Sequence, residues 1–596
     1  MFNWRLYRAT FVPVILALAI AAFSLSAWPA PYTSTLAPDA FNGARALAEA
    51  KSLAATHPDR RPGSAGDRAL AEHVAQEIEA LGGTASGGFS VSTRSLHAQT
   101  IDGERTLTTV IAQRPGSTDA APIVILAHRD AAGRGAVAEV SGTAALLELA
   151  RAFATRETRR TIILVSTSGG SGGAAGAADF VAHSRGPLDA AIVLGDVAGS
   201  RERKPFVVPY SDGFGSAPEQ LQRTVAAALA QETAANPGAP SVIGQLAHLA
   251  FPLTAGEEGP LDARGLPAVL VQVSGEAGPA AGEAVSGERL EEFGRGVLGA
   301  VDALDTAPDV SGAMQTGVLI QHQTFPVWAL RLLVASLLLG PLLLGIDALA
   351  RLRRRHVPVG RWTLWTLACA FPFLLCALFA CLIGWLGVVA APAAPVLPSA
   401  LPFEGAPARA VLACALVLAL AWLCWPILVR RLGLEVRPGS QAAGLATLLV
   451  LVAVSLVLWA VDPFTALLLL PALHLFLFIV SPERRPRPPV ALALVAVALA
   501  PLALLISFYA DQLGLGPGEV AWTAVLLLAG GHLGILGALM WSLVLGCMTA
   551  GAILATTPAP APTSVGSGDV TEITIRGPRS YAGPGSLGGT ESALRR

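Results

Sequence analysis

The sequence IVILAHRDAAGRGAVAEVSGTAALLELAR, residues 123–151, places a short apolar run before a polar tripeptide, His128-Arg129-Asp130, and a long segment rich in alanine and leucine. A short apolar run followed by a helix-forming segment is typical of the strand-to-helix unit of an α/β protein. Comparable apolar runs recur later in the chain, at 161–166, 190–194 and 268–273.

Continuous apolar strands bracketed by helices indicate a sheet that is buried on both faces. We therefore predict an α/β/α sandwich with a mostly parallel central sheet over residues 31–325, a length sufficient for one large α/β domain. Helices are expected at 40–54, 65–81, 142–154, 174–184, 217–232 and 287–304.

Composition excludes a wholly soluble protein. Of 596 residues, 53% are hydrophobic and only 14% charged, and the mean hydropathy is +0.57. A typical soluble domain has about 25% charged residues. The formal net charge of -1 leaves no surplus of basic groups to neutralise phosphates, so nucleic acid is not an expected partner.

Apolar runs long enough to cross a bilayer occur at the N-terminus and after about residue 325. Residues 1–30 combine a basic flank with an apolar core and form a signal anchor or a signal peptide, so the following domain is exported. Residues 326–555 are predicted to form an all-α bundle of about seven spans, and 556–596, rich in Pro, Gly and Ser, a disordered tail. The seven runs are 327–349, 363–391, 410–429, 441–461, 463–481, 489–510 and 519–554; the last fits a half-span and a full span.

Arginine clusters follow the first, third and fifth of these runs, whereas the intervening connections carry almost no basic residues. Loops rich in arginine stay in the cytoplasm, which predicts an extracytoplasmic domain at 31–325 and a cytoplasmic tail. Lys51 and Lys204 are the only lysines, and alanine, glycine and proline are frequent. That bias is typical of a GC-rich bacterial genome, so we expect a bacterial cell membrane protein.

All six cysteines lie after residue 368, in the apolar part of the chain. The domain at 31–325 therefore has neither a disulfide framework nor a thiolate metal site. Any chemistry there must use histidine, carboxylate or hydroxyl groups.

Ligands of α/β sheets bind beyond the carboxyl ends of the strands. Polar or glycine-rich residues follow three of the predicted strands: His128 and Asp130 after the first, Gly170 and Ser171 after the second, and Asp196 after the third. We predict that these five residues line one ligand-binding cleft.

Four segments resemble the co-catalytic zinc aminopeptidases, metallopeptidase family 28. They are the entry at 57–64, the His128-x-Asp130 pair, the helix at 141–151 and the Gly-Leu-Pro-Ala sequence at 265–268. The resemblance covers about 57–305 and implies an α/β/α sandwich, two zinc ions and peptidase activity.

The resemblance also implies positions for the zinc ligands. His128 and Asp196 stand at two of them. The bridging aspartate falls on Ala138, with Glu139 one place along, and the last histidine has no counterpart in 274–286, where Glu276 is nearest. Glu139 and Glu276 are thus possible substitute ligands.

The family's paired glutamates, general base and zinc ligand, fall on Gly170 and Ser171. A metal site without its bridging ligand and its base binds zinc weakly and generates hydroxide poorly. We therefore interpret the domain as a pseudo-peptidase that binds or scaffolds, without a cofactor. An active zinc aminopeptidase with substitute ligands is the alternative.

The glycine-rich stretch 169–173 allows two further interpretations. It satisfies G-x-S-x-G, so Ser171 with His128 and Asp196 would be a serine triad, in which Asp130 is a further weak candidate. It also satisfies G-x-G-x-x-A, a nucleotide-binding pattern. In the simplest interpretation it is a tight turn that fills the space left by the glutamates.

A third functional class is a transporter or lipid-handling bundle with a docked regulatory domain. It requires paired ionisable groups within the spans, whereas only isolated ones such as His474 and His532 occur. The expected partners are the lipid bilayer, a peptide or other amine-bearing ligand, or a second membrane protein.

Overall fold

The computed structural model describes residues 2–34, 36–83, 88–184, 186–280, 282–310, 317–320, 322–392, 394–435, 441–481 and 486–557. The tail predicted at 556–596 lies almost entirely outside these residues. The α/β domain and the apolar helices form one compact unit.

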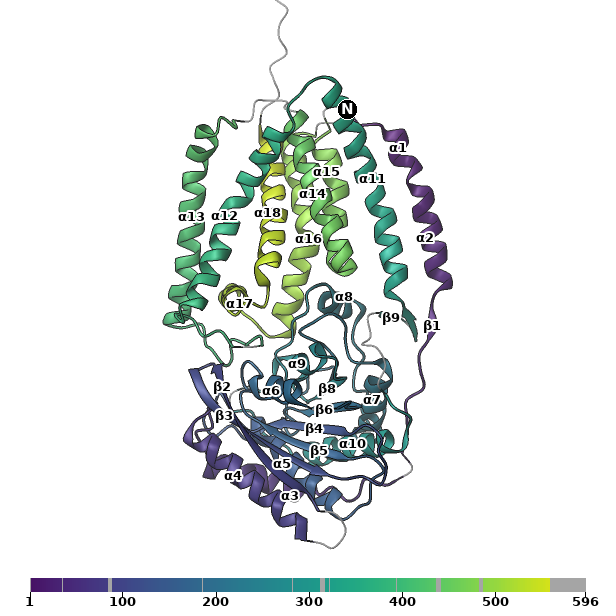
Figure 1. Cartoon of the computed structure of the whole chain (residues 1–596), viewed down its shortest axis with the longest axis vertical. Coiled ribbons are helices and arrows are strands. Elements are labelled where there is room, and N and C mark those ends of the chain that lie inside the picture. Colours follow the sequence, from purple (N-terminus) through teal and green to yellow (C-terminus); the bar gives the residue numbers. More distant parts are fainter. Residues whose placement is uncertain are drawn as a thin grey trace, which may run out of the picture. The chain divides into compact units, whose positions relative to one another are not determined.

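A seven-stranded sheet forms the centre of the domain (Figure 1). Its order is β2-β3-β5-β4-β6-β8-β7, and the four central strands β5, β4, β6 and β8 are parallel. The outer pairs are antiparallel, so the sheet is mixed, with the predicted parallel part at its centre. The strands are β2 (Ser90–Thr100), β3 (Gly103–Arg114), β4 (Ile123–His128), β5 (Ile162–Thr167), β6 (Ala190–Leu194), β7 (Val207–Val208) and β8 (Ala268–Val271).

Alternate residues of each central strand enter two different cores. Ile123 and Ile125 of β4 pack in the larger core, whereas Val124 and Leu126 pack in the smaller one. Helices cover both faces, which confirms the predicted α/β/α sandwich. The larger core includes residues of α3 (Gly43–Thr56), α4 (Ala65–Ala80), α5 (Val137–Ala154), α7 (Glu219–Thr233) and α10 (Gly287–Thr306), and the smaller core includes residues of α6 (Ala175–His183) and α9 (Glu258–Ala263).

Several elements of the domain have no counterpart among the predicted ones, among them β7, α9, one hairpin and a further short helix. The hairpin of β2 and β3 is rich in Ser, Thr and Arg, and its outer strand is largely exposed, so it lacks an apolar run. The short helix α8 (Val242–Ala250) has an apolar surface, and it contacts the apolar helices α15 and α16.

Among the residues that the structure describes, seven helices are long and apolar enough to cross a membrane, one at the N-terminus and six after residue 325. Of the seven predicted C-terminal runs, 463–481 forms a shorter helix, and 519–554 divides into a short helix and a long one around Gly530–Gly534. The C-terminal helices are α11 (Val327–Arg354), α12 (Gly360–Trp385), α13 (Ala406–Arg431), α14 (Gln441–Val461), α15 (Pro463–Ile479), α16 (Pro488–Gln512), α17 (Pro517–Ala529) and α18 (Gly534–Thr556).

The N-terminal segment is tied to both parts of the chain. Its helices α1 (Trp4–Ala9) and α2 (Phe11–Phe23) lie along α11, and the Tyr7 hydroxyl is 2.7 Å from Nδ1 of His474 in α15. Strand β1 (Ser26–Ala27) then pairs with β10 (Gln323–Phe325), which also pairs with β9 (Val318–Ile320). His474 therefore has a local hydrogen-bonding partner, as isolated histidines in apolar helices usually do.

We predict that the mature protein keeps its N-terminal segment as an anchor, because cleavage before Pro31 would remove β1 and leave β10 with an unpaired edge. Mass spectrometry of peptides from the purified membrane protein should detect peptides from residues 4–28. A mature chain beginning near residue 31 would contradict this expectation.

Candidate functional site

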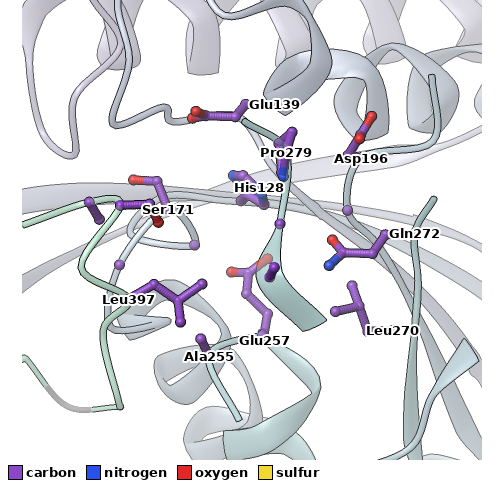
Figure 2. Close-up of a pocket in the computed structure, with 18 of the residues that line it drawn as sticks. His128, Glu139, Ser171, Asp196, Ala255, Glu257, Leu270, Gln272, Pro279 and Leu397 are labelled. Atoms are coloured by element: carbon purple, nitrogen blue, oxygen red, sulfur yellow. The ribbon is translucent and has the colours of Figure 1, made fainter. Parts of the chain in front are cut away.

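A cavity of about 180 Å³ lies at the carboxyl ends of the central strands. Of the five residues predicted to line a cleft there, His128, Gly170, Ser171 and Asp196 line this cavity, whereas Asp130 does not. Acidic side chains and His128 face it, together with residues of the connection between α12 and α13 (Figure 2). Its ionisable residues are His128, Glu139, Asp196, Glu257 and Glu276.

Asp130 organises the glycine-rich loop that borders the cavity. Its buried carboxylate accepts hydrogen bonds from the backbone N–H groups of Gly169, Gly170 and Ser171, at 2.9 to 3.0 Å, and from the Ser171 hydroxyl at 2.5 Å. Hydrogen bonds to a buried carboxylate are among the stronger ones in proteins. Asp130 thus holds the loop in place. A serine nucleophile would donate its hydroxyl hydrogen to the histidine, but the Ser171 hydroxyl donates to Asp130 and not to His128.

His128, the last residue of β4, lies at the centre of the cavity (Figure 2). Its Nδ1 is 3.0 Å from the carbonyl oxygen of Asp130, which orients the ring. Burial lowers the pKa of the imidazole, but the carboxylates of Asp130, Glu257 and Glu139 outweigh it, so that the pKa is raised above its ordinary value. The cavity therefore favours a positive charge at its centre.

Glu257 is the functional candidate that the sequence analysis missed. Its carboxylate is buried beside His128 and accepts a hydrogen bond of 2.6 Å from the Thr167 hydroxyl at the end of β5. Burial raises its pKa to about 7, although His128 and Thr167 oppose that shift. In sequence Glu257 is one of two adjacent acids between Gly256 and Gly259, a pattern that carries no recognisable motif.

Gly170, on which the sequence analysis placed the general base of the zinc aminopeptidases, lies too close to its neighbours to carry a side chain. A Cβ at this position would overlap the Cβ of His128 and would lie 2.9 Å from Cδ of Glu257. Carbon atoms pack at about 3.5 to 4.0 Å, so no residue except glycine fits here. His128 and Glu257 therefore occupy the space in which a glutamate at position 170 would begin.

Gly172 and Gly173 allow another segment to approach the same loop. A Cβ at position 173 would overlap Pro392, and one at position 172 would lie 3.4 Å from Val396. The backbone N–H of Ala394 donates to the carbonyl oxygen of Gly173 at 3.1 Å. The connection between α12 and α13 thus forms part of the cavity wall, which was not predicted.

Glu139, in the first turn of α5, and Asp196, which follows β6, both face the cavity (Figure 2). Asp196 accepts backbone hydrogen bonds from Ala198 and Gly199 through Oδ1, whereas its buried Oδ2 has no partner among the described residues. Burial raises the pKa of Asp196 to about 6 and also raises that of Glu139, whose Oε2 accepts from the N–H of Ala132. Both carboxylates are thus anchored by backbone groups.

Glu276, the other possible substitute ligand, is engaged elsewhere. Its carboxylate lies 3.0 Å from Nε2 of His248, and both side chains are buried. Within the described part of the chain, no three His, Cys, Asp or Glu side chains form a group that could hold a metal ion. With no side chain at position 170 and Ser171 bound to Asp130, these residues do not fit the family's pair of zinc ions.

Residues 109–246 match the model of peptidase family M28, which confirms the predicted resemblance for that segment. No curated protein matches the chain. Similar solved structures include glutaminyl cyclase from Bacteroides thetaiotaomicron (14% identity, TM-score 0.35, 45% of this chain and 99% of that chain). They also include the zinc aminopeptidase BSAP from Bacillus subtilis (10% identity, TM-score 0.32, 46% and 98%).

We expect Gly170→Ala to lower the free energy of unfolding by about 2 kcal/mol, because the added methyl group overpacks the site. Gly133→Ala is the matched control, since a Cβ there meets its neighbours at ordinary distances of 3.7 and 3.8 Å. Denaturant unfolding in detergent measures both. Equal stability of the two variants would show that the loop can relax away from His128.

Glu258, next to Glu257, belongs to a buried acidic group outside the cavity. Burial raises its pKa to about 8, against a hydrogen bond of 2.6 Å from the Thr254 hydroxyl, and the nearby Asp212 has its pKa raised by burial to about 7. In the folded state Glu258 therefore keeps a proton that it releases in the unfolded chain above its ordinary value of 4.5. The free energy of unfolding must fall as pH rises from about 4.5 to about 8.

We expect Glu258→Gln to remove part of this pH dependence, because the amide stays neutral and its oxygen can still accept from Thr254. The variant should raise the unfolding temperature at pH 8.5 and change it little at pH 4.5. Glu79→Gln, at an exposed position, is the control and should behave alike at both pH values. A stabilisation that is the same at both pH values would contradict the assignment.

Proposed function

We propose that the α/β domain is a ligand-binding pseudo-peptidase, exported by a bacterial membrane protein whose long apolar helices span the bilayer. The observation that carries this proposal is the overlap that any side chain at position 170 would make with His128. A glutamate at position 170, where the resemblance places the general base, would therefore have no room.

The remaining groups do not replace the lost chemistry. Hydrolysis at neutral pH requires an activated water, which a zinc peptidase obtains from its metal and its base. Glu276 is paired with His248, and Ser171 donates to Asp130, so neither is free to act on a substrate. The cavity is therefore proposed to bind a ligand without hydrolysing it.

The charges of the cavity favour an amine-bearing ligand, such as the amino end of a peptide. Carboxylates surround the cavity, and two buried oxygens, Oδ2 of Asp196 and Oε2 of Glu257, have no hydrogen-bond partner among the described residues. A buried acceptor without a donor is costly, and an ammonium group supplies three donors and the complementary charge. This is the chemistry that would occupy the cavity.

A zinc aminopeptidase with substitute ligands is the second candidate. The observation that favours it is Glu257, which places a carboxylate with a pKa of about 7 beside His128. Its zinc ligands would come from His128, Asp196 and Glu139. The carboxylates of Asp196 and Glu139, however, already accept hydrogen bonds from backbone N–H groups.

The arginines at the ends of α11 and α13 support the proposed orientation. Arg351, Arg353 and Arg354 lie in the last turn of α11, and Arg430 and Arg431 in that of α13. Placing these turns in the cytoplasm puts the domain on the opposite side of the membrane.

We expect the purified full-length protein to hold near-zero zinc after dialysis against buffer with trace zinc, as measured by elemental analysis. We also expect no release of amino acids from peptides, with or without a chelator, and Asp196→Ala should therefore change no turnover. One or two tightly held zinc ions per chain, with chelator-sensitive peptidase activity lost in Asp196→Ala, would establish the second candidate instead.

A further inference from the structure

A second cavity, of about 400 Å³, lies among the apolar helices α12, α13, α16, α17 and α18. Its volume falls within the range of about 300 to 1,000 Å³ that is typical of sites for small organic molecules. The lining contains no charged residue; Leu505, Ala524 and Trp541 are typical members.

The hydroxyl groups at this apolar cavity are already used by the protein. Tyr509, Thr523 and Ser542 each donate to a backbone carbonyl oxygen, at 2.6 to 2.8 Å. The cavity therefore presents only hydrocarbon to an occupant, and a polar head group would lose its hydrogen bonds there. A hydrocarbon chain, in contrast, gains dispersion contacts when it fills such a space.

Neighbouring residues of one segment line both the apolar cavity and the cavity around His128, which we call the anionic cavity. Phe251 and Leu253 line the apolar cavity, and Thr254 and Glu257, only a few residues on, line the anionic one. Leu397, which lines the anionic cavity, packs in the same apolar cluster as Leu253. The segment 251–257 is thus a shared wall of the two cavities.

Side chains form a second connection between the cavities. Glu276, at the anionic cavity, is 3.0 Å from Nε2 of His248, and Nδ1 of that ring is 3.2 Å from the Tyr509 hydroxyl at the apolar cavity. The ring of Tyr210 stacks on His248 with centroids 3.5 Å apart. All four side chains are buried, so this contact holds the two cavities in a defined relation.

We infer that the two cavities together bind one amphiphile, a membrane lipid whose hydrocarbon chain enters the apolar cavity and whose amine-bearing head group enters the anionic one. The binding of the amine-bearing head group rests on the proposed function, and the site for the hydrocarbon chain is added here. Leu513 and Leu515, which follow α16, line the apolar cavity at the end where Arg203 of the domain donates to the carbonyl oxygen of Gln512, so this cavity reaches the side on which the head group lies. Because the surrounding lipid is as apolar as this cavity, the hydrocarbon chain alone does not favour the cavity over the bilayer. The charged head group therefore decides which amphiphile binds.

The test uses the full-length protein in nanodiscs and a dodecylamine analogue with a diazirine near the end of its chain. After photolysis, peptide mass spectrometry should locate the label on α16 and α17, above the level on the largely exposed helix α2. Unlabelled dodecylamine should compete, whereas butylamine, which lacks the chain, and dodecanol, which lacks the amine, should each compete at least about tenfold less well.

Two variants separate the two ends of the ligand. Glu257→Gln removes the negative charge that faces the amine of the head group but keeps an oxygen that accepts from Thr167. Ala524→Trp places a large side chain in the apolar cavity, at an exposed residue that lines it. Each should reduce specific labelling about tenfold. Ala415→Trp, at an exposed position of α13 outside the cavity, is the matched control and should reduce it less than twofold. Ala524→Leu serves as a smaller filling change if the tryptophan variant does not fold.

The outcomes distinguish this inference from the proposed function. Equal competition by butylamine and dodecylamine, without label on α16 or α17, would overturn the amphiphile and leave the amine-binding cavity in place. Equal competition by dodecanol, or labelling unchanged in Glu257→Gln, would show a cavity filled by ordinary lipid and would overturn the inference. Failure of every amine to bind to the folded protein would overturn both.

Discussion

The close approach of the Gly170 backbone to His128 is the constraint on which the site depends. The carboxylate of Asp130 draws the glycine-rich loop onto the end of β4 through three backbone N–H groups and the Ser171 hydroxyl. At that distance only glycine fits at position 170. One buried carboxylate thus sets the loop position, and in that position any side chain at residue 170 would overlap His128.

The same glycines let two other segments come close. Glu257 takes part of the volume beside His128, and the connection between α12 and α13 packs on Gly172 and Gly173. Four acidic side chains line this cavity, and its wall includes residues of the connection between α12 and α13. The glycines therefore determine the shape of the cavity, because they let these segments come close.

Backbone carbonyl groups of the domain hold it to the apolar helices. The Thr465 hydroxyl of α15 donates to the carbonyl oxygen of Ala250 at 2.7 Å, and the Tyr509 hydroxyl of α16 donates to that of Phe251 at 2.6 Å. Ala250 is the last residue of α8, and Phe251 is the first residue of the segment 251–257 that both cavities share.

The sequence by itself determined the α/β/α class, the central strands, the position of the cleft and the apolar character of the C-terminal half, because these depend on local periodicity and on the order of elements. The resemblance to zinc aminopeptidases also predicted that their glutamate pair falls on Gly170 and Ser171, since motif spacing is a property of the chain. Whether zinc binds, and which side of the membrane the domain faces, stay predictions.

Only the tertiary structure decided which groups share the cavity. Glu257 is about 130 residues from His128 in sequence, and the 392–400 connection is more than 200 residues from the glycines on which it packs. No local pattern records such pairs, because their meeting depends on how helices and strands pack. The availability of Glu276 was likewise decided by a partner, His248, on a helix that the sequence analysis did not predict.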